Sequence, residues 1–371
     1  MMTQTYAIFL DTFRYLRSRY LFWIVLGISA IAAVALFATY SFTPDGLKIL
    51  WFKPIDNPQL AQGTAGRDMF ISGLFNGFYV KFWLGWGAMI LALISTASLL
   101  PDFLSDGAID LSLSKPISRW KLLLLKFLSG MLFVLIQLVL AVGLAYLIIG
   151  IRFDLWIHAA LLGIPLLTLQ FFYLYSIAAL ISVFTRSTIA TLLGTLIAWL
   201  IIFLAQFVSN SFIKQAYSTQ ELLQRTEQRI VRYEEISTER ELSSREQSRL
   251  NSYIEDRESH QSIYNFVEPW AKRSQSIILF VPKTGDLQKY LATKIKAPVS
   301  NEFFGLFMDI SNEEFRPANM DKETMQDALE AESVADRAVR QISLKKSILS
   351  SLLACAVLLG IATRRFTKRD Y

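Results

Sequence analysis

The chain has 371 residues, of which 53% are hydrophobic and only 18% are charged. A soluble domain carries about 25% charged residues, and the mean hydropathy here is +0.38, so composition argues against a soluble globular protein. The net charge of +6 does not predict a nucleic-acid-binding protein, because Lys and Arg cluster beside apolar runs. The lipid bilayer is therefore the predicted solvent.

Six long stretches of the chain contain no charged residue. A helix that crosses a membrane needs about 20 mostly apolar residues, and we expect one span in each stretch. These stretches are 20–42, 82–100, 127–150, 155–184, 188–209 and 347–363. The predicted fold is an all-α polytopic membrane protein with six transmembrane helices.

Basic residues flank these stretches on one predicted side of the membrane. They are Arg14, Arg17, Arg19, Lys115, Arg119, Lys121, Lys126, Arg186, Arg364, Arg365, Lys368 and Arg369. Cytoplasmic loops are enriched in Lys and Arg, so we expect both termini in the cytoplasm and the loops 43–81, 151–154 and 210–346 outside. The predicted location is a bacterial cytoplasmic (inner) membrane.

Residues 3–18 place apolar side chains at helical spacing opposite Arg14 and Arg17. This pattern is typical of a helix that lies in the inner membrane interface. An extension of the first span into the cytoplasm is an equal alternative.

The long segment 210–346 predicts a large, mainly helical extracytoplasmic insertion between the fifth and sixth spans. No Gly or Pro occurs from Thr195 to Glu268, and Glu and Arg alternate with sparse apolar residues. The apolar positions do not keep the strict heptad of a sustained coiled coil, so a bent helical hairpin is expected, with its tip near Ser243 and Ser244. The predicted domains are a membrane domain at 1–209, the external domain at 210–346, and the sixth span with a basic tail at 347–371.

Motifs for catalysis are absent from the sequence. There is no G-x-x-x-x-G-K-[ST], H-E-x-x-H, C-x-x-C or G-x-S-x-G pattern, and His158 and His260 are far apart. We therefore expect no enzyme, no metal site and no directly bound cofactor. Gln137 and Gln170 lie within spans, as does Gln206, and hydrogen bonds between helices are preferred for them over a substrate path.

The loop 101–122 between the second and third spans has a different character. Residues 101–114 place Asp102, Asp106 and Asp110 among apolar side chains, so a short amphipathic helix is expected before Lys115 and Pro116 end it. Such a helix is suited to a groove on another protein. An ordinary basic connector between two spans is the alternative.

The stretch "DGAIDLSLSKPISRWKLLLLKFL" resembles the cytoplasmic loop of permease subunits of type-2 ABC exporters. The matching positions are Gly107, Asp110, Leu111, Leu113, Lys115, Pro116, Ile117, Ser118 and Arg119. The segment "VPKTGDL" and the tail "RRFTKRDY" are also similar to that family. Ser105 and Asp106 depart from the usual Arg-Glu or Glu-Ser pair, and the external insertion is longer than is usual.

The resemblance implies a permease of an ATP-driven exporter, in which a separate ABC ATPase subunit binds ATP and Mg²⁺. It also implies a second permease chain, as a homodimer or heterodimer. The long insertion indicates an extracytoplasmic protein partner or a specialised cargo, with a lean toward lipid-like, peptide or amphiphilic molecules. The implied ATPase-coupling residues are Asp102, Phe103, Asp106, Gly107, Asp110, Leu111, Leu113, Lys115, Pro116 and Arg119.

Two other functions stay open on the sequence alone. One is a non-transporting membrane scaffold or sensor that binds a partner through its external helices. The other is a membrane-embedded enzyme, which is disfavoured because the spans hold no cluster of His, Cys or carboxylate side chains.

Overall fold

The computed structural model describes residues 14, 20–50, 54–104, 118–278, 281–296, 322–340 and 344–368. The interfacial helix expected at 3–18 therefore falls, except for Arg14, outside the described residues. The chain forms two compact units. The first, here the membrane unit, comprises Met1–Leu204, Phe280–Ala297 and Ser343–Tyr371, and the second, here the hairpin unit, comprises Ala205–Leu279 and Pro298–Ile342.

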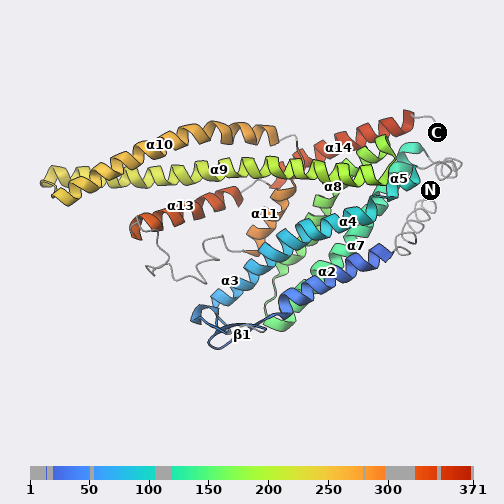
Figure 1. Ribbon diagram of the computed structural model, residues 1–371, viewed down its shortest axis with the longest axis horizontal. Coiled ribbons are helices and arrows are strands. Elements are labelled where there is room, and N and C mark those ends of the chain that lie inside the picture. Colours follow the sequence, from blue (N-terminus) through green and yellow to red (C-terminus); the bar gives the residue numbers. More distant parts are fainter. Residues whose placement is uncertain are drawn as a thin grey trace. The chain divides into compact units, whose positions relative to one another are not determined.

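The membrane unit is a bundle of helices with a small sheet at one end (Figure 1). Its described elements are α2 Tyr20–Ala38, β1 Tyr40–Thr43, β2 Gly46–Ile49, β3 Ile55–Asp56, η1 Pro58–Leu60, α3 Ala65–Leu74, η2 Phe75–Gly87, α4 Ala88–Thr96, α5 Leu99–Phe103, α7 Arg119–Phe153, η3 His158–Leu162, α8 Gly163–Thr185, the start of α9 Thr188–Glu239, α11 Thr284–Ile295 and α14 Leu344–Lys368.

Among the described residues, five helices are long and apolar enough to cross a membrane. They are Ala65–Phe103, Arg119–Phe153, His158–Thr185, Thr188–Glu239 and Leu344–Lys368. The first expected span forms α2, whose apolar helical part, Trp23–Ala35, is shorter. A polytopic helical membrane protein is thus confirmed, whereas the count of six spans stays a prediction.

The second expected span begins much earlier than its apolar run. Thr64 caps the helix with its side chain, which accepts a hydrogen bond from the backbone N–H of Arg67 at 3.2 Å. From Ala65 the chain stays helical into η2, a π-helix. The expected loop 43–81 is therefore wrong over its second half, because Gly66, Asp68 and the following glycines hid the helical pattern.

The first half of that expected loop forms a three-stranded antiparallel sheet in the order β1-β2-β3. Thr43 pairs with Gly46, and Gly46 also pairs with Asp56. A Cβ atom at Gly46 would lie 2.1 Å from the carbonyl oxygen of Ile55, so only glycine fits between the strands. The expectation of an all-α fold is wrong here, since strands of two to four residues are too short to give a periodic signal.

Aromatic side chains form the centre of the membrane unit. The Tyr175 ring stacks on Phe127 and Phe171, with centroid distances of 4.9 and 5.3 Å. Gly130 lies so close that a Cβ atom there would be 2.7 Å from the Tyr175 hydroxyl. The Tyr79 hydroxyl donates to the carbonyl oxygen of Ala141 at 2.9 Å, which joins η2 to α7.

The hairpin unit contains the expected helical hairpin. The rest of α9 is followed by α10, Ser244–Ile278, which folds back along it (Figure 1). Phe212 stacks on Trp270 at 6.2 Å, and the Ser209 hydroxyl donates to that of Ser274 at 3.0 Å. The predicted hairpin is therefore confirmed.

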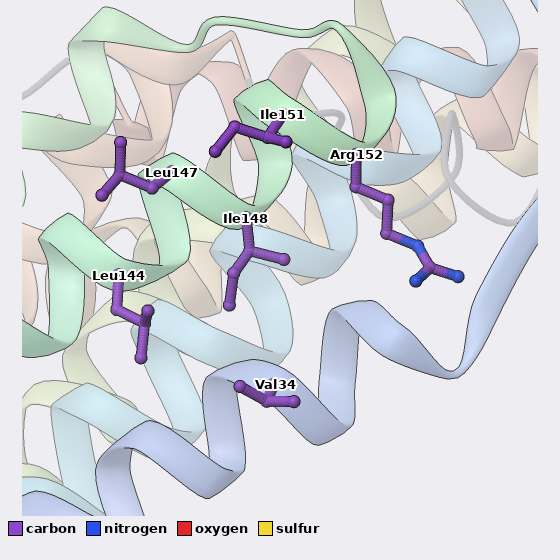
Figure 2. A pocket seen from close by; sticks show the side chains of 6 residues that line it. All are labelled: Val34, Leu144, Leu147, Ile148, Ile151 and Arg152. Atoms are coloured by element: carbon purple, nitrogen blue, oxygen red, sulfur yellow. The ribbon is translucent and has the colours of Figure 1, made fainter.

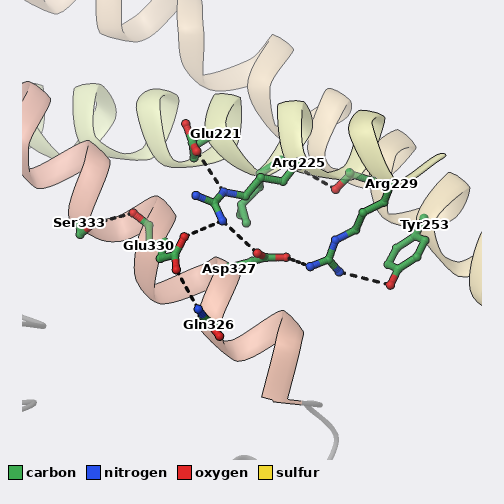
Figure 3. Close-up of polar contacts among 10 residues, drawn as sticks. Glu221, Arg225, Arg229, Tyr253, Gln326, Asp327, Glu330 and Ser333 are labelled. Atoms are coloured by element: carbon green, nitrogen blue, oxygen red, sulfur yellow. Dashed lines mark hydrogen bonds and ion pairs between the residues drawn. The ribbon is translucent and has the colours of Figure 1, made fainter. Parts of the chain in front are cut away.

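A third helix, α13 Lys322–Arg340, is attached to α9 by ion pairs (Figure 3). Arg225 contacts Asp327 at 3.1 Å and Glu330 at 2.8 Å, and Arg229 also pairs with Asp327. One turn of α13 also presents Ala331 and Ala335, both fully buried. The ion pairs fix the register of α13 against α9.

Candidate functional site

The two helix ends that flank the segment 105–117, the end of α5 and the start of α7, meet the C-terminal end of α14 at one end of the membrane unit. The ring of Phe103, the last residue of α5, lies 6.1 Å from that of Phe366 in α14. Arg119, the first residue of α7, donates from Nη1 to the carbonyl oxygen of Thr367 at 3.4 Å. Lys126 places its ammonium 5.9 Å from the Phe103 ring. The C-terminal end of α14 therefore connects both sides of the segment.

Basic side chains gather at this same end. The Arg365 guanidinium lies 5.6 Å from the ring of Phe184, near the end of α8, and Arg186 follows that helix in the left-handed conformation, with φ of 52°. With Arg119 and Lys126 on α7, these residues come from three helices. The structure thus brings together basic flanks that the sequence placed on one side of the membrane.

The expected ATPase-coupling residues are only partly described. Asp102 is exposed, Arg119 is half-buried, and Phe103 is buried against α14; their role in coupling stays a prediction. The remaining expected residues lie outside the described part of the chain and stay predictions. They are Asp106, Gly107, Asp110, Leu111, Leu113, Lys115 and Pro116.

A second feature is a buried chain of amide groups between η2, α8 and α11. The Gln170 side chain is 1% exposed and donates from Nε2 to the carbonyl oxygen of Gly85 at 3.2 Å. Gln288 donates from Nε2 to Oε1 of Gln170 at 3.0 Å. A Cβ atom at Gly85 would lie 2.3 Å from the Gln288 Nε2. The predicted interhelical hydrogen bond of Gln170 is confirmed, whereas Oε1 of Gln137 has no partner within the described residues.

Charged residues continue this feature from α11 to α14. Ser347 donates from its hydroxyl to Asp286 at 2.9 Å, and the Lys289 ammonium lies 3.5 Å from the same carboxylate. The backbone N–H of Lys283 donates to the Ser351 hydroxyl at 2.9 Å. Sequence reasoning missed these contacts because it assigned 210–346 to an external domain. The signal in the sequence was the pair of opposite charges formed by Asp286, in the segment "VPKTGDL", and Lys289, three residues later.

The arrangement of Gln170, Gln288, Asp286 and Ser347 holds α8, α11 and α14 in register. No group of three His, Cys, Asp or Glu side chains among the described residues is placed to hold a metal ion. His158 Nδ1 lies 2.8 Å from the Tyr146 hydroxyl at the end of the unit that carries η3.

Comparison with known proteins identifies the family. Residues 84–371 match the family described as ABC-2 family transporter protein, which covers α4 and all the elements that follow it. Neither the curated proteins nor the solved structures yield a match. The match includes the segment 105–117, the amide chain and the hairpin unit. Because it extends over well more than half of the sequence, the chain belongs to the ABC-2 family of transporter proteins.

Proposed function

We propose that this chain is the membrane-spanning permease subunit of an ATP-driven exporter and that a separate ABC ATPase docks on the segment 102–119. Membership of the family makes the chain a membrane permease component of an ABC transporter and implies an ABC ATPase partner. The single observation that supports the docking position is the meeting of Phe103 and Arg119 with the end of α14.

The proposed mechanism is mechanical. The chain carries no phosphate-loop motif, so ATP and Mg²⁺ bind to the partner. A push on the segment 105–117 acts directly on α5 and α7, which pack on α8, and on α14 through Phe366 and Thr367. Movement of α8 or α14 then reaches α11, because Gln170 and Ser347 bind it from those two helices.

The proposed orientation places the end with Arg119 and Arg365 in the cytoplasm. Basic residues at one end of a bundle favour that end as the inner one, and both termini then lie inside a bacterial cytoplasmic membrane. The hairpin unit is proposed as extracytoplasmic, where its charged helices would contact an external protein. A second permease chain completes the proposed assembly.

A scaffold or sensor is the second candidate function. The observation that favours it is the charged hairpin unit, in which α9, α10 and α13 form a structure much larger than a connector between two spans requires. Such a protein would use its external helices and would not depend on the segment 105–117.

The test reverses two charges in that segment, Asp106→Lys with Asp110→Lys. If the carboxylates meet basic partners in a desolvated contact, the change costs about 2–5 kcal/mol of binding free energy. The matched control, Asp45→Lys with Asp56→Lys, changes the net charge equally at exposed positions of the sheet end. We expect normal membrane levels for both variants.

The measurements are the amount of ABC ATPase that copurifies with the chain and the ATP hydrolysis that depends on transport. Both are expected to fall in the Asp106 and Asp110 variant and to stay normal in the control. Full copurification and full coupled hydrolysis in the first variant would make the segment a plain connector and place the scaffold function first.

A further inference from the structure

An apolar crevice of about 480 Å³ lies between α2 and α7 on the surface of the membrane unit (Figure 2). The side chains that line it are Val34, Leu144, Leu147, Ile148, Ile151 and Arg152. Val34 is 47% exposed, Leu147 48% and Ile151 76%, so the crevice opens toward the surroundings of the helices. Its size is in the range of a site for a small molecule, and Arg152 is the one charged group in its described lining.

A polar pocket of about 550 Å³ adjoins the crevice at the sheet end. Its described lining consists of Ser41, Phe42, Gln62, Gly63, Arg67, Arg152, Phe153 and Asp154. Arg152 lines both spaces, and its Nη2 donates to the carbonyl oxygen of Tyr40 at 3.0 Å. The guanidinium is therefore oriented at the junction between an apolar and a polar space.

The charged side chains in the described lining of the two spaces are Arg67, Arg152 and Asp154. Arg67 pairs with its neighbour Asp68 at 2.7 Å, which offsets its charge. The crevice itself is apolar apart from Arg152, which is the cation at the junction. Asp154 is an anion that lines the polar pocket and not the crevice. The described linings therefore offer hydrocarbon in the crevice, the positive charge of Arg152 where the two spaces join, and in the polar pocket the negative charge of Asp154 together with the paired Arg67.

We propose that this site binds a phospholipid with an ethanolamine headgroup. In such a lipid the phosphate is attached next to the glycerol that carries the acyl chains, and the ammonium group is outermost. An acyl chain then fills the crevice, the phosphate meets the planar guanidinium of Arg152, and the ammonium donates hydrogen bonds to Asp154. A choline headgroup has no N–H donor, and a glycerol headgroup has no cation.

The proposed site differs from the ordinary contact of a spanning helix with lipid. Exposed apolar side chains bind hydrocarbon without regard to the headgroup, whereas Arg152 and Asp154 add a requirement for two charges at set positions. The inference concerns the leaflet that meets the sheet end. It does not depend on the direction of transport or on where an ATPase docks.

The test measures phospholipids bound to the purified full chain in detergent by native mass spectrometry. Equal mixtures of palmitoyl-oleoyl phosphatidylethanolamine, phosphatidylglycerol and phosphatidylcholine are the probes. We expect one phosphatidylethanolamine to be retained at least about tenfold better than the other two lipids, as expected for hydrogen bonds to charged groups. Equal retention of the three lipids would mean ordinary hydrocarbon contact and would overturn the proposal.

Variants separate the three parts of the site. Arg152→Gln should lower retention of phosphatidylethanolamine about tenfold, and Arg152→Lys should restore part of it. Asp154→Asn should remove the preference for phosphatidylethanolamine over phosphatidylglycerol while phosphate binding persists. Ile148→Trp should lower retention by filling the crevice.

Matched controls keep these results interpretable. Lys48→Gln removes an exposed cation at the same end of the unit, and Leu140→Trp adds an indole to an exposed position of α7 outside the crevice. Both controls should bind lipid as the unchanged chain does. If Ile148→Trp and Arg152→Gln retain phosphatidylethanolamine as well as the controls do, the proposal is wrong.

Discussion

Gln288 of α11 donates a hydrogen bond to Gln170 inside α8, with 3.0 Å between the Gln288 Nε2 and the Gln170 Oε1. The two residues are 118 positions apart, and the hairpin helices lie between them in the sequence. The chain thus leaves the membrane unit, forms α10, and returns to insert α11 against α8. Amides in such apolar surroundings must find partners, so this contact selects where the returning helix packs.

Removing the central amide tests its role. Gln170→Leu leaves the Gln288 amide and the carbonyl oxygen of Gly85 each without this partner, and a buried group left unsatisfied costs about 1–3 kcal/mol. We expect a lower Tm of the purified protein in detergent. Gln220→Leu, at an exposed position of α9, is the control and should leave Tm nearly unchanged. An unchanged Tm in Gln170→Leu would show that the amide chain does not stabilise the fold.

The close approach of η2 and α11 predicts a second effect. Gly85→Ala places a Cβ atom 2.3 Å from the Gln288 Nε2, while Gly77→Ala in the same π-helix meets no heavy atom within 4 Å. We expect Gly85→Ala to lower Tm. Gly77→Ala should have a higher Tm than Gly85→Ala. Because the clash is with a side chain, Gln288→Ala should relieve part of the cost, as a double-mutant cycle would measure. Strict additivity of the two substitutions would contradict this explanation.

Asp327 holds α13 to two arginines at once (Figure 3). Its side chain is 17% exposed and that of Arg225 is 27% exposed, so the pairs are only partly screened by solvent. Asp327→Asn should weaken the attachment by about 1–2 kcal/mol, between the values for surface and buried ion pairs. Hydrogen exchange of α13 measures the loss of protection.

The control for that experiment is Glu255→Gln, which removes one carboxylate from an exposed position of α10. It should leave the exchange of α13 unchanged. If Asp327→Asn and the control exchange alike, then contacts other than these ion pairs hold the helix in place.

Much of the fold could be predicted because hydrocarbon and water impose simple patterns. Runs without charge marked α7, α8 and the first part of α9, and the charged stretch without Gly or Pro after them predicted a helical hairpin. The break at Ser243 and Ser244 was visible because those residues favour helix starts. These signals are local, so one sequence suffices to read them.

The parts that were missed depend on distant contacts. α11 has a mixed composition, and it packs in the membrane unit through its buried Leu287 and Leu291 and through its contacts with Gln170 and Ser347. The strands at Gly46 and Ile55 are too short for any periodicity. The burial of Phe103 against Phe366, 263 residues later in the chain, could not be read from its own surroundings.

The start of α10 predicts a dependence on acid. Glu246 accepts hydrogen bonds from the Arg240 guanidinium at 2.6 Å and from the backbone N–H and hydroxyl of Ser243 at 2.8 Å. The Arg240 bond, followed by those of Ser243, lowers the pKa of Glu246 from its ordinary value of 4.5 to about 2. The folded state therefore favours the charged carboxylate.

The sign of the effect follows directly. Because folding lowers the pKa of Glu246, its charged carboxylate stabilises the fold above pH 4.5. This contribution is lost as the pH falls toward 2. We expect the unchanged chain to have a higher Tm than Glu246→Gln above pH 5, with the difference shrinking as the pH falls to about 2. Glu255→Gln serves as the control, and a difference independent of pH would contradict the assignment to Glu246.

The proposed orientation gives the last prediction, which uses the chemistry of cysteine. Cys355 is the single cysteine of the chain and is buried, so Cys355→Ala gives a background in which each added thiol reports alone. Ser244→Cys lies at the start of α10 and Ser300→Cys in the segment proposed as external. In the sequence, Ser114→Cys lies between the end of α5 and the basic start of α7. In intact cells, an impermeant thiol reagent should label positions 244 and 300 and should not label 114.

After the membrane is opened, position 114 should react as well, which excludes burial as the reason for its protection. Labelling of 114 in intact cells would invert the orientation and move the ATPase site away from this loop, because ATP is hydrolysed in the cytoplasm.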